Sequence, residues 1–404
     1  MTAAQVSVPV AENAQRPPSE QSGFTGGEPR RFAFIDALRG LAALAVCGVH
    51  FFSDESYHGV LLQTFPRWIS KPLELGTIGV QVFFVLSGFV IAYSIRKTRV
   101  TGRFLGNFAL RRSLRLDPPY WTTLFMVLAI NVIGRRLWHD VGFQQPSAWD
   151  VVINMLYLPQ LLGRPQFIVS VAWTLAIEIQ FYLVLVTAVG ISQRIGNRRS
   201  MGYPTFGYAI FFTTLAAAAL ASRLELVHIS PAVFLVYWLP FFLGALACWS
   251  LEGTVWSGWF WIFATLTSAS YFGDFDGRIF GGVFTALAIY AGGRLGKLYD
   301  WGNVAPLQFL GKISYSLYLG HAIVGQKTIK LAHRFLGPSP LAGTLAFLAA
   351  FVVSILAAYL MYRFLERPSV RLARRFKLRP EPKPQHLPTA PLLETTSAIA
   401  GPAA

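Results

Sequence analysis

The sequence contains little charge and almost no cysteine. Only 13% of its 404 residues are charged, whereas 54% are hydrophobic. Soluble domains carry about a quarter of their residues as charged side chains, so this composition excludes an ordinary soluble fold and indicates a protein of the lipid bilayer. The two cysteines, Cys47 and Cys248, both lie in apolar runs. We therefore expect two small buried side chains and no disulfide framework.

Acidic residues are also scarce. The chain has 19 Asp and Glu against 35 Lys and Arg, which gives a formal net charge of +16. An excess of basic residues can indicate a nucleic-acid partner, but here the charge is distributed among the loops between apolar runs. We assign the excess to membrane topology and expect no nucleic-acid partner.

No pattern of a cleavable signal peptide occurs at the N-terminus, because residues 1–29 are polar and lack a basic start and a short apolar core. We interpret residues 1–31 as a disordered cytoplasmic tail and residues 32–368 as a transmembrane domain. Residues 369–404 are interpreted as a basic and then Pro- and Ala-rich cytoplasmic tail. No internal repeat or second folded domain is apparent.

Apolar runs predict an all-α integral membrane protein, because a helix needs about 20 mostly apolar residues to cross a bilayer. The run 151–162 is short and is closed by Pro159 and Gly163, so we expect an interfacial or re-entrant segment there. The ten runs predicted to span are 34–52, 76–95, 118–134, 169–191, 206–222, 232–250, 254–271, 278–293, 308–326 and 339–362.

The basic residues predict how this bundle of about ten helices is oriented. With ten spans, 25 of the 35 Lys and Arg residues fall on the side that holds both termini. The positive-inside rule then predicts that both termini are cytoplasmic. An eleventh span would move the basic cluster 363–383 to the opposite side, against that rule. We expect a multi-pass protein of the bacterial cytoplasmic (inner) membrane.

The first predicted span carries two basic side chains. Arg39 and His50 are eleven residues apart, about three helical turns, so they lie within about 20° of the same helix face. An ionisable residue within a span costs about 2.5 to 3.5 kcal/mol and usually faces the protein interior or a cavity. His50 is the first candidate for chemistry, although a structural histidine that bonds a neighbour fits the sequence equally well.

Glu178 is a second ionisable residue within a predicted span. In the ten-span arrangement its depth is comparable with that of His50, so we expect the two side chains to meet. A carboxylate beside a histidine fixes its tautomer and raises its basicity, as a general base requires. A buried pair that only ties two helices together is the alternative.

A basic segment precedes Pro118. Its Arg112 and Arg115 are spaced i, i+3 and share a face if the segment is helical. Guanidinium groups bind phosphate oxygens in a bidentate manner, so this pair suits a phosphorylated cofactor at the cytoplasmic side. Charge alone favours the alternative that these arginines set topology or touch lipid headgroups.

Other spans carry candidates for substrate binding. Ser87 lies near the middle of the second predicted span, and Tyr315, Tyr318 and His321 lie in the ninth. Tyr315 and Tyr318 share a helix face and can bind a polar substrate. Packing between helices is the favoured interpretation for each of the four residues taken alone.

Six segments occur in a characteristic order: IDALRGLAALAVCGVH, FFVLSGF, RRSLRLDPPYW, WTLAIEIQFYL, GKISYSLYLGH and FLERP. Together they cover residues 35 to 368 and closely resemble the acyltransferase 3 family of integral membrane O-acyltransferases. Those proteins modify bacterial surface and secreted glycans and some small molecules. The resemblance implies a ten-helix bundle that moves an acyl group, above all acetyl, from cytoplasmic acyl-CoA to a hydroxyl.

The resemblance also implies site residues. The family's functional Arg and His fall on Arg39 and His50, its Arg-x-x-Arg pair on Arg112 and Arg115, and its helix-four carboxylate on Glu178.

The chain departs from the family pattern at three positions. Ile179 stands where a second Glu is common, Gly320 where a Trp is common and Ala37 where a Gly is common. Some relatives carry an extra C-terminal hydrolase-like domain, which this chain is expected to lack.

The working hypothesis is therefore a membrane O-acyltransferase with His50, Glu178 and Arg39 as catalytic residues. Arg112 and Arg115, with Arg39, would bind acyl-CoA, a co-substrate, and no metal or tightly bound cofactor is expected. The acceptor would be the hydroxyl of a carbohydrate or small molecule. The alternative is a proton-coupled transporter or flippase in which His50 and Glu178 relay protons, which matching broken helices in two halves would favour.

Overall fold

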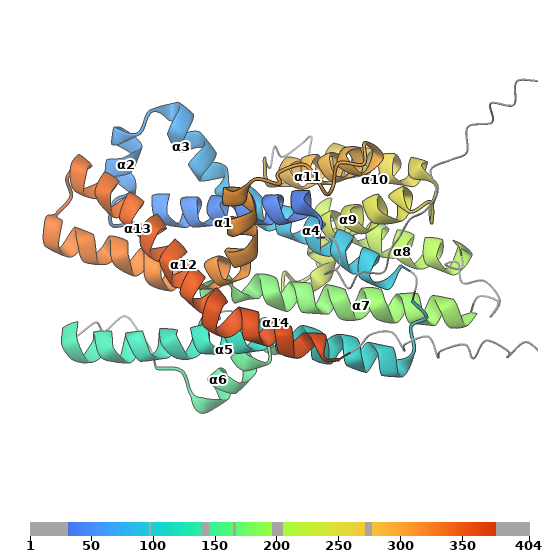
Figure 1. Ribbon diagram of the computed structural model, residues 1–404, viewed down its shortest axis with the longest axis horizontal. Helices are drawn as coiled ribbons and strands as arrows, with labels where there is room; N and C mark the ends of the chain where they lie inside the picture. Colours follow the sequence, from blue (N-terminus) through green and yellow to red (C-terminus); the bar gives the residue numbers. More distant parts are fainter. Residues whose placement is uncertain are drawn as a thin grey trace, which may run out of the picture.

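A computed structural model describes residues 31–96, 98–138, 145–164, 167–195, 205–270 and 277–376, and among these no β-strand occurs (Figure 1). Most of the two predicted tails, residues 1–30 and 377–404, lies outside the described residues. The α-helices are α1 (Ala33–Phe52), α2 (His58–Thr64), α3 (Arg67–Glu74), α4 (Ile78–Ile95), α5 (Gly102–Trp138), α6 (Ala148–Met155), α7 (Trp173–Ile195), α8 (Thr205–Arg223), α9 (Trp238–Leu251), α10 (Ser257–Ala269), α11 (Gly277–Arg294), α12 (Ala305–Leu336), α13 (Pro340–Met361) and α14 (Arg367–Arg374).

Each of the ten predicted runs coincides with one of the longer helices, and the all-α prediction is confirmed. Five helical segments of the described chain are long and apolar enough to cross a bilayer, which makes this a membrane protein. The prediction of ten spans remains a prediction. The five segments are Ala33–Phe52, Arg67–Ile95, Ser170–Arg194, Phe234–Leu251 and Pro340–Arg374.

Helix α5 is much longer than its predicted span, because the basic segment before it is helical as well. Its 37 residues continue through Pro118 and Pro119. The prolines have no N–H to donate to the carbonyls four residues before them. One turn later, Thr122 and Thr123 add bonds by donating their side-chain hydroxyls to the two proline carbonyls at 2.9 and 2.8 Å. The helix therefore carries its basic face without a break into the bundle.

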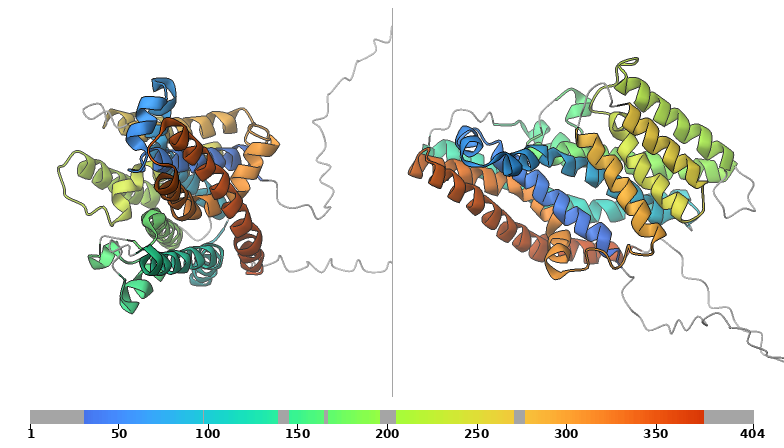
Figure 2. Two further views of the ribbon diagram at one scale, coloured as in Figure 1. Left: turned by 90° about the vertical axis from the view of Figure 1, so that its left-hand side faces the viewer. Right: turned by 90° about the horizontal axis from the view of Figure 1, so that it is seen from above.

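The bundle is organised around α1, which packs against α12 on one side and α4 on the other. Seen from above, α12 and α13 (orange to red) lie at one side and α8 to α10 (green to gold) at the other, with α1 (blue) between (Figure 2). Close approach of α4 and α9 depends on two glycines. A Cβ atom at Gly88 would collide with the carbonyl oxygen of Phe241, and one at Gly244 with that of Val85.

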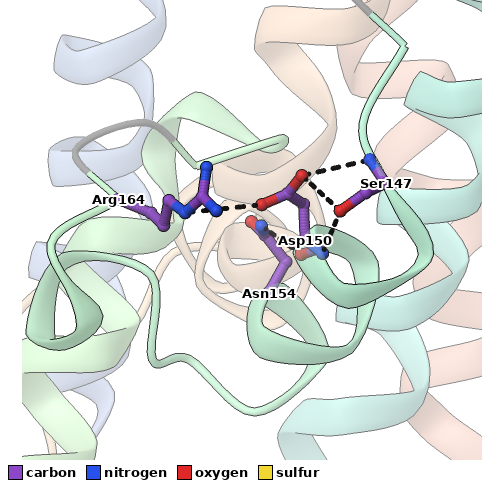
Figure 3. A network of polar contacts seen from close by, with 4 residues as sticks. All are labelled: Ser147, Asp150, Asn154 and Arg164. Carbon is purple, nitrogen blue, oxygen red and sulfur yellow. Dashed lines mark hydrogen bonds and ion pairs between the residues drawn. The ribbon is translucent and has the colours of Figure 1, made fainter.

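The segment between α5 and α7 forms the short helix α6, whose eight residues are too few to cross a bilayer, as predicted. Ser147 and Asp150 form a capping box: each side chain accepts the backbone N–H of the other residue, at 3.1 and 3.0 Å (Figure 3). The Ser147 hydroxyl also donates to Oδ2 of Asp150 at 2.6 Å. This bond and the bond from the Ser147 N–H, followed by Arg164 at 3.9 Å, hold the pKa of Asp150 below its ordinary value.

Helix α6 is held against α5 by two further bonds. Tyr120 donates its hydroxyl to the carbonyl of Asn154 at 2.8 Å, and the Trp121 indole donates to the carbonyl of Met155 at 3.1 Å. The amide oxygen of Asn154 also accepts the backbone N–H of Ile168 at 2.9 Å. After this segment, the chain reaches the start of α7, which lies beside α12.

After α13, a π-helical turn (Tyr362–Glu366) leads directly into α14, which packs along α5 (Figure 1). The predicted domain boundary at residue 368 therefore falls inside continuous helical structure. Pro368 lies in the first turn of α14, directly after the π-helical turn.

Candidate active site

A cavity lies inside the bundle between α1, α4, α5, α7 and α12. Its empty volume is about 790 Å³, including open space at its mouth, and apolar side chains such as Phe83, Phe84 and Leu116 form much of its wall. Seven of the nine predicted site residues line it: Arg39, Ser87, Arg112, Arg115, Glu178, Tyr315 and Tyr318. His50 and His321 lie outside this lining.

Three arginines from two helices face this cavity. Arg39 comes from α1, and Arg112 and Arg115 come from one face of α5, as their spacing predicts. Among the described residues, none of the three forms an ion pair or a hydrogen bond, and the Nε of Arg115 is buried without a partner. The guanidinium of Arg112 instead lies over the ring of Tyr182, 4.5 Å from its centroid. The cavity therefore presents unpaired positive charge.

Glu178 lies in the same cavity and is held by serine. Ser87 of α4 donates its hydroxyl to Oε1 of Glu178 at 2.5 Å, and the hydroxyl of Tyr182 lies 3.4 Å from the Ser87 oxygen. Glu178 also interacts electrostatically with Arg39 and Arg112. The carboxylate thus partly balances the arginines.

The predicted contact between Glu178 and His50 does not form; no hydrogen bond or ion pair joins the two in the described chain. The hydroxyls of Thr174 on α7 and Tyr318 on α12 are hydrogen-bonded at 2.8 Å. Glu178 follows Thr174 along α7 and His321 follows Tyr318 along α12, and these two helices run in opposite directions (Figure 1). The prediction compared only the depths of Glu178 and His50 along their own helices, and depth does not show how two helices are oriented.

His50 instead lies beside His321, with ring centroids 5.2 Å apart. His321 is fully buried, and its Nδ1 lies 2.8 Å from the carbonyl oxygen of Tyr318. The ring of Tyr318, which lines the cavity, is 6.0 Å from that of His321. The two histidines are therefore next to the cavity, beyond its Tyr318 wall.

The two tyrosines on α12 line the cavity, and the hydroxyls of both are hydrogen-bonded within the protein. Tyr315 donates to the carbonyl of Leu116 at 2.8 Å, and Tyr318 is bonded to Thr174. Their rings thus shape the wall and fix α12 against α5 and α7. Substrate binding by either residue stays a prediction.

Sequence reasoning missed Thr174, Tyr182 and Glu366. Thr174 and Tyr182 stand four residues before and after Glu178, so helical spacing was a usable signal. Glu366 is buried, accepts the hydroxyl of Ser316 at 2.7 Å and interacts electrostatically with Arg115 and Arg39. It belongs to the FLERP segment, to which no role was assigned.

An all-helical membrane protein with a basic, apolar-walled cavity beside a histidine pair has the parts of a group-transfer enzyme: sites for an anionic substrate and for proton transfer. The family model described as an acyltransferase domain matches residues 32–363 of the chain. The chain belongs to the acyltransferase 3 family and is an acyltransferase of groups other than aminoacyl groups.

Two named relatives extend this similarity. Acyltransferase MdmB of Streptomyces mycarofaciens is 28% identical over 382 residues, which cover 85% of this chain and 92% of the relative. Putative O-acetyltransferase SACOL0978 of Staphylococcus aureus (strain COL) is 26% identical over 384 residues, or 87% of this chain and 59% of the relative. The chain thus spans little more than half the length of that second protein. No solved structure matches the chain.

Proposed function

We propose that this protein transfers an acyl group, most simply acetyl, from acyl-CoA to a hydroxyl of an exported carbohydrate or small molecule. The observation that carries the proposal is the set of three unpaired arginines on one cavity, Arg39, Arg112 and Arg115. Positive side chains that share one cavity repel one another, so an anionic ligand is the natural partner for them.

Acyl-CoA has the shape and charge that this cavity fits. Its phosphates suit the guanidinium groups, because planar guanidinium forks bind phosphate oxygens in a bidentate manner. Its pantetheine arm and acyl chain are slender and largely uncharged, and they suit the apolar wall that Phe83 and Leu116 provide. Acyl-CoA acts as a co-substrate, and the name of one relative as a putative O-acetyltransferase supports acetyl as the group.

His50 is the general base of the proposed reaction. It takes the proton of the acceptor hydroxyl, whose oxygen attacks the thioester carbonyl; the carbon–sulfur bond breaks, and the CoA thiolate receives the proton from His50. An acyl-His50 intermediate is the competing route, because histidine can act as a nucleophile. Trapping of labelled acyl-enzyme without acceptor supports that route.

The proposal also includes topology. Acyl-CoA is a cytoplasmic metabolite, and the positive-inside rule favours cytoplasmic termini for this chain. We propose ten spans in the bacterial inner membrane, with the arginine cavity open to the cytoplasm and the acceptor approaching His50 from the other side.

The test uses the full chain in lipid nanodiscs, with acetyl-CoA and an extract of cell-envelope polysaccharide. Free CoA should be released, and His50→Ala should lower the rate by about 10² to 10⁴-fold while folding normally. Arg112→Ala should raise the KM for acetyl-CoA. Arg103→Ala is the matched control, since Arg103 lies on the same helix but is exposed and outside the cavity.

Two results would contradict the proposal. Unchanged KM in both Arg112→Ala and Arg115→Ala would exclude the phosphate role. Absence of CoA release together with movement of a glycan or lipid across the membrane would favour a transporter.

A further inference from the structure

The ring of His321 is held in one tautomer by the backbone. Its Nδ1 lies 2.8 Å from the carbonyl oxygen of Tyr318 and 3.2 Å from that of Leu317. Carbonyl oxygens only accept hydrogen bonds, so the network assigns the hydrogen to Nδ1 of His321. In the neutral ring, Nε2 then carries a lone pair and acts as an acceptor.

This acceptor has no partner. The side chain of His321 is fully buried, and Nε2 makes no hydrogen bond within the described chain. Buried polar atoms are almost always satisfied, so an unsatisfied one indicates a functional role or a group that binds there. The ring that lies against His321 and carries N–H groups is that of His50, tilted by 43° with its centroid 5.2 Å away.

No carboxylate of the described residues is bonded to His50. None of the described acidic or basic side chains forms an ion pair with His50, and Glu178 is bonded to Ser87. A histidine that serves as a base needs one nitrogen protonated and bonded to an acceptor, so that the other nitrogen keeps its lone pair for the substrate.

We infer that His321 is the positioning residue of this site: its Nε2, which has no partner in the described part of the chain, is the acceptor for an N–H of the His50 ring. That bond leaves the other His50 nitrogen free to take the acceptor proton. This inference rests on the proposed role of His50 as the base. After proton transfer, His50 carries two N–H groups, and His321 still accepts one of them while the other returns the proton to the CoA thiolate.

Two substitutions distinguish the role of Nε2 of His321 from that of Nδ1. Glutamine places its amide near the position of Nε2 and retains an acceptor there, whereas asparagine places its amide near Nδ1 and retains the donor to Tyr318. If His321 acts through Nε2, His321→Gln keeps most of the activity. His321→Asn should then lower kcat by about 10²-fold or more, with the KM for acetyl-CoA unchanged.

The kinetic test measures kcat, KM and the pH profile of kcat for CoA release from acetyl-CoA in nanodiscs with polysaccharide extract. His321→Phe controls for ring volume, and the melting temperature checks folding of each variant. A full kcat for His321→Asn would show that only the structural bond to Tyr318 matters and would overturn the inference. A His321→Gln variant as slow as His321→Asn would overturn it as well.

A second measurement uses the wild-type protein, so it needs neither an active enzyme nor a variant that folds correctly. Wild-type protein labelled with ¹⁵N-histidine in lipid should show His321 protonated at Nδ1 and hydrogen-bonded without a proton at Nε2. A protonated Nε2 on His321 would overturn the inference even in an active enzyme. A protein that binds and cleaves no acyl-CoA would instead defeat the proposed function, so the two failures are distinguishable.

Discussion

The hydroxyl of Ser87 on α4 donates a 2.5 Å hydrogen bond to the carboxylate of Glu178 on α7, inside a cavity that three arginines share. Glu178 forms an ion pair with none of those arginines, although it interacts electrostatically with Arg112. The serine therefore binds the carboxylate, while the three arginines have no ion-pair partner among the described residues and stay available for a ligand.

The first prediction concerns this bond. In Ser87→Ala, the released carboxylate of Glu178 pairs with a cavity arginine and competes with the phosphates of acyl-CoA. A hydrogen bond to a charged group contributes about 1.5 to 3 kcal/mol, so we expect a rise of about tenfold or more in the Kd for acetyl-CoA. Equilibrium binding in nanodiscs measures it.

A double-mutant cycle checks the reason. Glu178→Gln has no charge with which to compete, so it should not weaken binding, and Ser87→Ala combined with Glu178→Gln should restore near wild-type affinity. If the double variant binds as weakly as Ser87→Ala, the serine acts through the shape of the cavity and competition by Glu178 is excluded.

The second prediction concerns the glycine contact between α4 and α9. In Gly88→Ala the new methyl group meets the Phe241 carbonyl oxygen, so the two helices must separate. Forced overpacking costs about 1 to 3 kcal/mol, and we expect a lower melting temperature in nanodiscs. Gly244→Ala should behave in the same way.

Gly106 supplies the matched control for this substitution. It lies in helix α5, and no atom stands within 4 Å of the position that its Cβ would take. Gly106→Ala should leave stability unchanged or raise it by up to about 1 kcal/mol, because glycine disfavours helix. Equal losses at Gly88 and Gly106 would show that helix separation is not the cause.

Local periodicity predicted the parts of the site that depend on one helix. The spacing of Arg112 and Arg115 placed both on one face of α5, and both line the cavity. Apolar runs likewise predicted where the helices lie, because the hydrophobic length that a bilayer demands is visible in the sequence. The start of α5 was missed, since its basic residues resemble a loop by composition although Arg and Lys are good helix formers.

Pairing between helices could not be predicted in the same way. Rise per residue gave Glu178 and His50 comparable depths, but contact also depends on helix rotation and on tilt, which packing determines. His321 was identified only as a candidate for substrate binding, because its neighbour on α1 is 271 positions away in the chain. Glu366 lies in the FLERP segment but was given no role, since its partner Ser316 comes from another helix.

The third prediction is a pH dependence at α6. Hydrogen bonds from Ser147 lower the pKa of Asp150 below its ordinary value of about 3.9. Because the pKa of Asp150 is lower in the folded state, its charge stabilises the folded segment at any pH above the ordinary pKa. This stabilisation is lost as the pH falls through the pKa of the folded state. Asp150→Asn should therefore expose α6 more than wild type does near pH 6, with a smaller difference near pH 3.

Hydrogen exchange measures this effect. The protection of a peptide covering residues 145–164, corrected for the intrinsic exchange rate at each pH, reports the opening of α6. Ser147→Ala should also lower protection, because it removes the N-terminal cap. A difference between Asp150→Asn and wild type that stays constant from pH 6 to pH 3 would exclude the charge of Asp150 as its cause.

The fourth prediction concerns Glu366, a buried carboxylate at the π-helical turn. It accepts the hydroxyl of Ser316 and interacts electrostatically with Arg115 and Arg39. In Glu366→Ala, Ser316 loses its acceptor and the two arginines lose a balancing negative charge. An unsatisfied buried group costs about 1 to 3 kcal/mol, so we expect a lower melting temperature in nanodiscs.

Two further variants separate the hydrogen bond from the charge. Glu366→Gln keeps an acceptor for Ser316 and loses the charge, whereas Ser316→Ala keeps the charge and loses the bond. If the charge balances the cavity arginines, Glu366→Gln should tighten the binding of acetyl-CoA, because less negative charge opposes the phosphates, and Ser316→Ala should not. Equal affinities for acetyl-CoA in wild type, Glu366→Gln and Ser316→Ala would show that Glu366 serves only to hold α12 against the end of α13.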